Sequence, residues 1–288
     1  MNSRFTAVPS RPERSRIRRS LALTALVAAC TSATIGLAAE GDLGTDRDAF
    51  TPCTHTIPAG SLLMEASSVY IDNRSGLPTN NYPEWLLRIG VTERFEWRFG
   101  VNYGVGSQGT IVTSVEVGEG TQDGSRLYET SLLYGFKLGT SDQDGWLPET
   151  CFIIEATTPV EGDVLGTVPV ATGAAGWELP VRFPFRRSEP WRLDVAVRYA
   201  YSEGLDGWFS RWTPSTVLRM PVTNRWELHA EWFGSYPVGA PGRNGEPFFS
   251  PGTHVMLTKN FELGVRVGWG LTAETAPFFC DAGCGWRW

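Results

Sequence analysis

The chain has 288 residues and a formal net charge of −6, and 12% of its residues are aromatic. This aromatic content excludes a disordered chain, the five cysteines are too few for a disulfide scaffold, and the acidic balance argues against nucleic acid as a partner. After the N-terminal segment no apolar run reaches about 18 residues, which excludes a helical membrane protein.

Residues 1–39 have the pattern of a secretory signal peptide. Six arginines lie within residues 1–20, and an apolar stretch rich in small residues follows from Leu21 to Ala39. A basic head, an apolar body and a small-residue exit predict export with cleavage after Ala38 or Ala39. Two alternatives stay open, a retained helical anchor and a lipoprotein cut that leaves Cys30 lipidated. Residues 40–60 are then predicted to be a short periplasmic N-terminal segment.

Residues 61–288 are predicted to form the barrel domain described next, because apolar and polar residues alternate there in short segments. Alternation with a period of two predicts β-strands and is clearest in 94–103, 191–201 and 261–271. Most of the predicted strands have about the 9–11 residues that cross a bilayer at a tilt. The twelve predicted strands are 61–71, 83–91, 94–103, 127–138, 149–158, 174–183, 191–202, 211–222, 226–236, 251–258, 261–272 and 278–288.

The connections between these strands alternate in length. Thr92-Glu93, Thr223–Arg225 and Lys259-Asn260 are tight, whereas 104–126, 159–173 and 237–250 are long, polar and rich in glycine. Short turns on one side and longer loops on the other are typical of outer-membrane barrels. The fold class predicted is therefore all-β, a transmembrane antiparallel up-and-down β-barrel of about 12 strands with both termini in the periplasm.

Alternation alone also fits a water-soluble β-sandwich with an aromatic core. The barrel is favoured because tryptophan and tyrosine cluster at strand ends, where amphipathic rings prefer the lipid headgroup zone, and because the alternation continues to Trp288. The predicted aromatic girdle is Trp85, Trp97, Trp191, Trp226, Trp269, Trp286 and Trp288.

The opposite strand face carries charge, and its basic residues are arginines more than lysines, since the chain has only Lys137 and Lys259. Guanidinium groups pair with facing carboxylates in a confined space better than lysine does. The predicted lumen-lining or constriction residues are Glu84, Arg88, Glu96, Arg98, Arg192, Asp194, Arg198, Glu227, His229, Glu231, Glu262 and Arg266.

The segment Asn81–Arg98 resembles the hallmark of a family of outer-membrane proteins grouped as "MetA-pathway of phenol degradation". The shared features are Pro-Glu, Arg-x-Gly and a hairpin that reads Thr-x-Arg-aromatic-Glu, and later pieces such as Gly268–Leu271 match its style. The chain departs from the family at Pro159–Gly162, where Pro-Thr-Gly is expected. The resemblance covers most of 60–288 and implies a transporter barrel. Its closing aromatic residue resembles the signal that the barrel-assembly machinery reads.

No hydrolase, metalloprotease or phosphate-loop motif occurs in the sequence, so no catalytic residue, cofactor or metal is predicted. His229 lies between Glu227 and Glu231 and is interpreted as one polar lining residue, with a metal or general-base role as the alternative. Cys53 precedes the first strand, where a disulfide with Cys151 or Cys284 is an alternative to free thiols.

These patterns predict a bacterial outer-membrane channel for the passive passage of small solutes, and the family resemblance implies aromatic or hydrophobic cargo. The expected partners are outer-membrane lipid, the barrel-assembly machinery and a small-molecule solute, without nucleic acid. The alternatives are a plugged structural barrel without transport and a secreted, soluble, Trp-rich β-sandwich that binds a ligand such as carbohydrate.

Overall fold

The structure is a computed structural model that describes residues 43–74, 76–106, 112–113, 127–162, 166–185, 189–204, 206–240 and 244–288. The predicted signal peptide, 1–39, and Cys30 lie outside the described residues. The described residues from Leu43 to Arg287 form one compact unit. Within the described part, no helix is long and apolar enough to cross a membrane.

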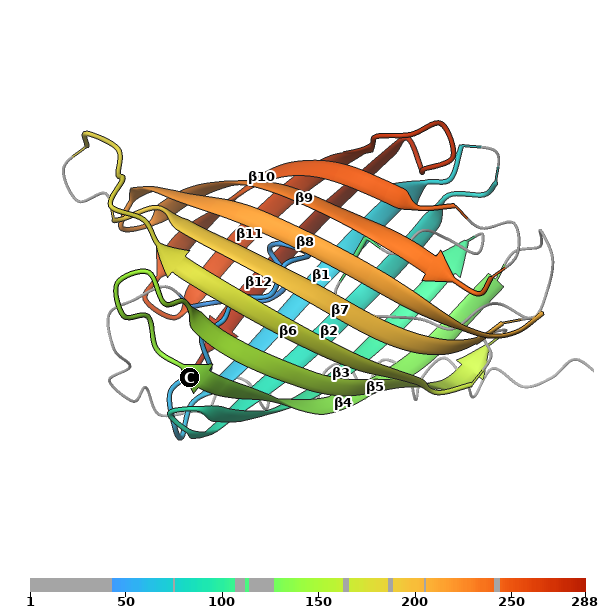
Figure 1. Ribbon diagram of the computed structural model, residues 1–288, viewed down its shortest axis with the longest axis horizontal. Coiled ribbons are helices and arrows are strands. Elements are labelled where there is room, and N and C mark those ends of the chain that lie inside the picture. The colour runs from blue at the N-terminus through green and yellow to red at the C-terminus, as the bar shows by residue number, and fades with distance from the viewer. Residues whose placement is uncertain are drawn as a thin grey trace, which may run out of the picture. The chain divides into compact units, whose positions relative to one another are not determined.

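Twelve antiparallel strands close into a barrel in which each strand pairs with its neighbours in the sequence and β1 pairs with β12 (Figure 1). The seam runs without a break from Leu63 opposite Arg287 to Asp72 opposite Phe278. This closure confirms the all-β barrel and excludes the two-sheet sandwich. The strands are β1 Leu62–Asp72, β2 Thr79–Thr92, β3 Phe95–Gly106, β4 Leu127–Ser141, β5 Glu149–Gly162, β6 Val168–Glu178, β7 Arg192–Gly204, β8 Gly207–Thr223, β9 Trp226–Val238, β10 Glu246–Thr258, β11 Phe261–Gly270 and β12 Phe278–Arg287.

Several strands extend beyond their predicted ranges because they continue through proline. Pro159 lies within β5, Pro237 within β9 and Pro247 within β10. Proline lacks the N–H that a strand ladder needs and therefore reads as a strand boundary. In a closed barrel each strand is paired on both sides, so the remaining bonds hold it past the proline. The predicted loops 159–173 and 237–250 shorten accordingly to 163–167 and 239–245.

The tight turns of the sequence lie at one end of the barrel, which we call the turn end; the opposite end is the loop end. In each of these turns a threonine that closes the preceding strand uses its hydroxyl to accept a hydrogen bond from the backbone N–H two residues later. The pairs are Thr92 with Arg94, Thr223 with Arg225 and Thr258 with Asn260, each at 3.2 Å. This local bond explains why the Thr-x-x-aromatic pattern recurs in the sequence.

The two faces of the barrel wall differ in polarity. On β3, Trp97 and Phe99 point outward and are each 45% exposed, whereas Glu96 and Arg98 point inward and are 0% and 2% exposed. An apolar outer surface around a charged interior is suited to a hydrocarbon surrounding, because a lipid-facing charge costs about 2–4 kcal/mol near the bilayer midplane.

Candidate functional site

Residues 43–57, called the plug below, lie inside the barrel among its inward-facing side chains. Asp46 and Thr51 are fully buried and Phe50 is 1% exposed, and Figure 1 shows this part of the chain in blue between the strands. The sequence pattern predicts 40–60 as a periplasmic lead-in ahead of the barrel. For residues 43–57 that placement is corrected, because the wall supplies the hydrogen-bond partners that this irregular segment requires.

The plug has no regular secondary structure, so its buried backbone N–H groups need other acceptors. Three carboxylates of the barrel wall accept them, and they come from β1, β9 and β3. The bonds run from Asp46 and Arg47 to Glu65 at 2.8 and 2.9 Å, from Phe50 and Thr51 to Glu231 at 2.9 and 2.6 Å, and from Ile57 to Glu96 at 2.9 Å. Charged acceptors form stronger hydrogen bonds than neutral ones.

The plug is a loop whose two arms are tied together. The backbone N–H of Cys53 on the second arm donates to Oδ1 of Asp46 on the first arm at 2.9 Å. The second arm leads back to the turn end, where Gly60 donates to the carbonyl of Gly90 at 2.9 Å and β1 begins. Its tip is Phe50, so the plug reaches into the barrel and returns to the end from which β1 starts.

Asp46 is the centre of a cluster of basic side chains. Its Oδ2 lies 2.6 Å from Nη1 of Arg98 and 3.6 Å from both Nη1 of Arg88 and Nζ of Lys137. Burial alone raises the pKa of a carboxyl, but the charges of Arg88, Lys137 and Arg98 outweigh it and hold the pKa of Asp46 well below its usual range. The plug therefore presents a carboxylate to the wall's arginines.

Asp48 makes a second such contact on the other side of the interior. Its Oδ2 lies 2.5 Å from Nη1 of Arg219 on β8 and 3.2 Å from Nδ1 of His254 on β10. Burial raises the pKa of Asp48, but the charges of Arg219 and His254 outweigh this effect, so the pKa of Asp48 lies well below its usual range. Two plug carboxylates thus fasten opposite parts of the wall.

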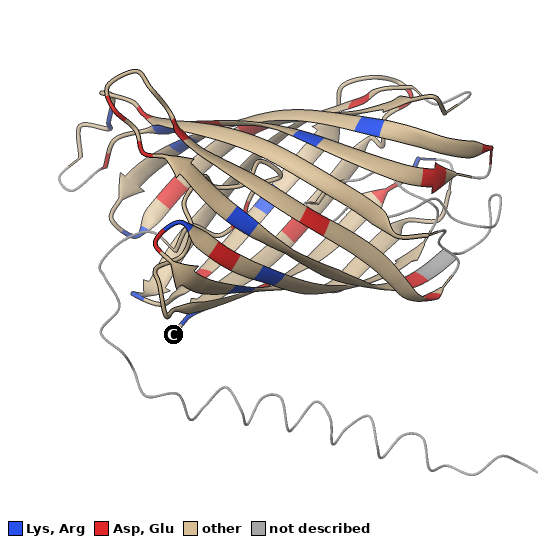
Figure 2. Ribbon diagram, turned by 60° about the horizontal axis from the view of Figure 1, so that its bottom comes forward, with Lys and Arg blue, Asp and Glu red and all other residues tan. Residues whose placement is uncertain are grey.

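The barrel wall also pairs its own charges. Arg88 binds Glu96 through two bonds of 2.7 and 2.9 Å, and Arg98 binds Glu155 at 2.6 Å. Basic and acidic positions lie close to one another on neighbouring strands (Figure 2). Buried pairs of this kind leave a large penalty if one partner is removed, because the other charge is then uncompensated.

The tip of the plug packs on aromatic rings of the wall. Phe50 stacks on Phe233 with ring centroids 4.4 Å apart, and the guanidinium of Arg198 lies 4.3 Å above the Phe50 ring. Phe248 and Phe279 continue the cluster, with centroids 5.1 and 6.0 Å from Phe233. The interior is therefore charged towards the turn end and aromatic around the tip.

Two residues of the β3–β4 connection also enter the barrel. Val112 is 1% exposed and packs with the aromatic cluster. The carbonyls of Val112 and Thr113 accept hydrogen bonds from Arg266 at 2.6 Å and from Arg198 at 3.3 Å. The interior is thus filled by the plug and, next to its tip, by these two residues of the β3–β4 connection.

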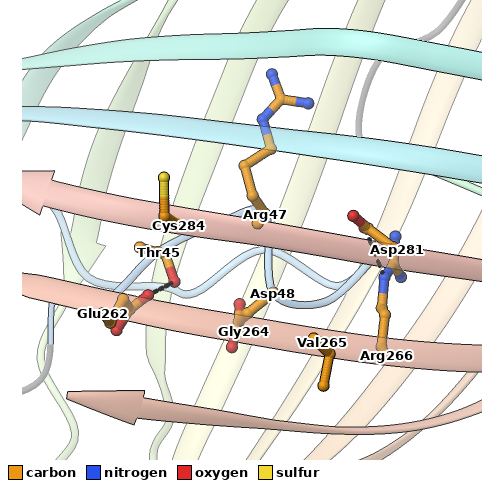
Figure 3. A pocket seen from close by; sticks show the side chains of 10 residues that line it. Thr45, Arg47, Asp48, Glu262, Gly264, Val265, Arg266, Asp281 and Cys284 are labelled. Atoms are coloured by element: carbon orange, nitrogen blue, oxygen red, sulfur yellow. Dashed lines mark hydrogen bonds and ion pairs between the residues drawn. The ribbon is translucent and has the colours of Figure 1, made fainter. Parts of the chain in front are cut away.

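Little space remains beside the plug where it meets β11 and β12. Figure 3 shows Thr45, Arg47 and Asp48 of the plug next to Glu262, Arg266 and Asp281 of these strands. The cavity between them holds about 10 Å³, which is no more than a water molecule occupies.

A second cavity of about 470 Å³ opens at the turn end and is lined by residues that include His55, Arg192, Arg219, Glu227 and His254.

The residues predicted to line the lumen lie inside the barrel. Arg192 retains 11% side-chain exposure and borders the cavity at the turn end. The others are buried: Glu84, Arg88, Glu96, Arg98, Asp194, Arg198, Glu227, His229, Glu231, Glu262 and Arg266. Many of them bind the plug, so in this structure they surround an occupied interior rather than an open constriction.

The residues predicted as an aromatic girdle occupy different heights on the wall. Trp97, Trp226 and Trp286 are exposed near the turn end, and Trp269 is exposed near the loop end. Trp191 directly precedes β7, Trp288 directly follows β12, and both are half-buried. Trp85 lies at the middle of β2, away from both ends, and so does not fit a girdle.

The sequence pattern does not identify the plug or the inward-facing phenylalanines. A signal for the rings was present, because Phe233 has the same strand parity as Glu231, and Phe279 the same parity as Asp281. An apolar ring on a polar face needs an apolar partner inside the barrel.

The disulfide alternative for Cys53 is not realised: Cys53, Cys151, Cys280 and Cys284 are free thiols.

A closed antiparallel barrel with an apolar outer wall and a charged interior belongs to the class of membrane β-barrel folds. An outer membrane channel from Pseudomonas putida F1 is similar in structure, with 11% identity, a TM-score of 0.54, and coverage of 82% of this chain and 98% of that one. The translocator domain of the autotransporter NalP from Neisseria meningitidis is similar too, with 9% identity, a TM-score of 0.52, and coverage of 95% and 96%. At these identities the likeness establishes the fold.

No protein-family model matches the sequence, and no curated protein matches it.

Proposed function

We propose that this protein is an outer-membrane channel for small solutes, and that the plug closes its lumen. The observation that supports the proposal best is the inverted polarity of the barrel, with apolar side chains outside and paired charges inside. Outer-membrane lipid and the barrel-assembly machinery are the corresponding partners. Residues 1–39 act as the export signal, and the turn end faces the periplasm.

The plug is suited to move because water can replace most of its contacts. Hydrogen bonds to Glu65, Glu231 and Glu96 and ion pairs of Asp46 and Asp48 join it to the wall. Wetted carboxylates and guanidinium groups remain stable as a channel lining, whereas a wholly apolar interior would resist water. Withdrawal through the turn end leaves a lumen lined by facing arginines and carboxylates.

The aromatic cluster favours solutes that carry an apolar ring. When Phe50 leaves, the faces of Phe233, Phe248 and Phe279 become available near the loop end, beside the guanidinium of Arg198. A ring with an attached anionic group matches this combination of stacking surface and positive charge. Such cargo agrees with the resemblance to the phenol-degradation family, and no catalysis is assigned to the chain.

Conductance in planar bilayers tests the proposal. The full chain is compared with Glu231→Ala, which removes the acceptor of the Phe50 and Thr51 amides and costs about 1–3 kcal/mol for each donor left unsatisfied. We expect rare openings in the parent chain and frequent openings in the variant. Asp142→Asn is the control, because the side chain of Asp142 is 81% exposed and, among the described residues, its ion pair is with Arg94.

Heat-modifiable migration in detergent gels confirms that each variant is folded. If folded Glu231→Ala barrels stay silent in bilayers, the structural-barrel alternative replaces the channel. Cargo is tested in liposomes by comparing benzoate with hexanoate, and equal uptake of the two would contradict the ring preference.

A further inference from the structure

Two histidines of the wall and one aspartate of the plug meet inside the barrel. His229 lies on β9 and His254 on β10, and in the pairing of these strands His229 is opposite Gly252, two residues before His254. The two imidazoles are therefore diagonal neighbours on the inward face. Together with Asp48 they bring one possible ligand atom each to within 4.8 Å of one another.

These three side chains carry buried polar atoms without hydrogen-bond partners among the described residues. They are both ring nitrogens of His229, Nδ1 of His254 and Oδ1 of Asp48. His229 is only 2% exposed. Buried polar groups are almost always satisfied, so such a concentration of unpaired atoms at one point indicates a missing partner.

The backbone makes room for this arrangement. A Cβ at Gly252 would lie 2.2 Å from Nε2 and 2.5 Å from Cε1 of His229, so glycine is required for the imidazole to lie against β10. At Gly264 a Cβ would lie 3.5 Å from Cβ of His254 and 3.9 Å from Cβ of Asp48, which is ordinary contact. The ring of His229 is thus held in place by the lack of a side chain opposite it.

We propose that Asp48, His229 and His254 form a binding site for a divalent transition-metal ion of the zinc class. Two imidazole nitrogens and one carboxylate oxygen are a common ligand set for zinc, whose fourth position is open to a water molecule or another oxygen. The metal takes Oδ1 of Asp48, while Oδ2 keeps its bond of 2.5 Å to Arg219.

Two more charged side chains lie beside the site. Arg219 is the facing cation, and Glu227 lies 3.7 Å from Nη1 of Arg219 and 3.9 Å from Nδ1 of His254. Glu227 is thus placed to neutralise part of the added charge. The cavity of about 470 Å³ at the turn end is lined by His254, Arg219 and Glu227, which gives an ion a route from that side.

Because Asp48 belongs to the plug and the histidines belong to the wall, a bound ion fastens the plug to β9 and β10. The site itself does not depend on the proposed channel function, but the effect of the ion on conductance rests on it. Zinc is then expected to reduce the openings of a channel variant with a loosened plug.

Metal binding is measured by calorimetric titration of the full, metal-depleted chain in detergent with Zn²⁺. We expect about one zinc ion per chain, and loss of this binding in His229→Ala and in His254→Ala. The matched control is His55→Ala, because the side chain of His55 is 50% exposed and lies outside the site. Co²⁺ gives a second readout, since its visible absorption reports four-coordinate binding and should be absent in Asp48→Asn.

Heat-modifiable migration again verifies that the variants are folded. The site is overturned if the parent chain binds zinc no better than the folded His229→Ala variant, or if His55→Ala removes the binding equally. If zinc binds as expected but leaves the openings of Glu231→Ala unchanged, the fastening of the plug is overturned and the site stands. If no variant conducts, the channel fails, and the zinc titration still decides the site.

Discussion

Glu231 shows how single residues of the wall hold the plug. Its carboxylate accepts the backbone N–H groups of Phe50 and Thr51 and the hydroxyl of Thr51, and it also pairs with Arg266 at 3.3 Å. A side chain that serves both the plug and the wall couples the two, so its removal affects both. Reporters inside the plug can therefore detect changes in the wall.

Cys53 is such a reporter. It is 3% exposed, and burial raises its pKa to about 12, so at pH 8 very little of the reactive thiolate is present. We expect alkylation of Cys53 to be roughly 100-fold or more slower than that of an exposed thiol, and faster in Glu231→Ala. Peptide mass spectrometry after iodoacetamide treatment measures both rates.

Cys280 serves as the internal control for this labelling. It lies on β12 with the strand parity opposite to that of the buried Asp281, so it faces outward and should react at the same rate in both chains. Equal acceleration of Cys53 and Cys280 would show general unfolding instead of plug release.

The plug carboxylates predict a response to acid. The pKa values of Asp46 and Asp48 are lower in the folded protein than in the unfolded chain. Their ionised forms therefore stabilise the closed state fully above about pH 4, the ordinary carboxyl range, and this stabilisation is lost as the pH falls further. We expect channel openings to increase below about pH 4, measured in planar bilayers. Openings that decrease on acidification would contradict the role of both residues.

At the scale of the elements, alternation was sufficient to predict all twelve strands, as in β3, β7 and β11. The boundaries were less predictable, because they depend on pairing with neighbours that lie far away in the sequence. β6 runs from Val168 to Glu178, whereas its pattern predicts 174–183, since Pro169 and small residues conceal its first half. The alternation of apolar and polar residues can be read from a short stretch of sequence, whereas the ends of a strand are set by the strands that pair with it.

The orientation of the strands can be tested with one charge at two depths. Val265 lies in the middle of β11 and is 55% exposed on the outer wall, whereas Leu271 directly follows that strand and is 53% exposed. We expect Val265→Arg to cost about 2–4 kcal/mol of unfolding free energy in lipid vesicles and Leu271→Arg to cost about 0–1 kcal/mol. Urea titration followed by tryptophan fluorescence measures both values. Equal costs would contradict a membrane around β11.

The plug could not be predicted as an element, because residues 43–57 have neither period-two nor helical periodicity. Its position depends on partners such as Glu65, Glu96 and Glu231, which are separated from it and from one another in the chain. The lumen residues themselves could be predicted from strand parity. Charged side chains alternate with apolar ones along each strand, and they must face inward because the outward face is apolar. Their pairing with Asp46 and Asp48 is a tertiary property that no local pattern contains.

At the scale of the whole molecule, closure of β1 on β12 leaves no free strand edge in the barrel. Such a barrel resists unfolding by detergent alone, so the unheated protein is expected to migrate faster in gels than the boiled protein. The apolar outer wall should also require detergent or lipid for solubility. A monodisperse sample in plain buffer, measured by light scattering, would be inconsistent with this surface.

The contacts of the plug tip constrain the order in which the protein folds and assembles. Phe50 and Thr51 precede β1, yet their bonds to Glu231 reach 181 and 180 positions along the chain. The plug therefore lacks part of its binding surface until the last third of the polypeptide has been synthesised and exported. The barrel therefore has to close, by pairing of β1 with β12, around a plug that was synthesised before any of its strands.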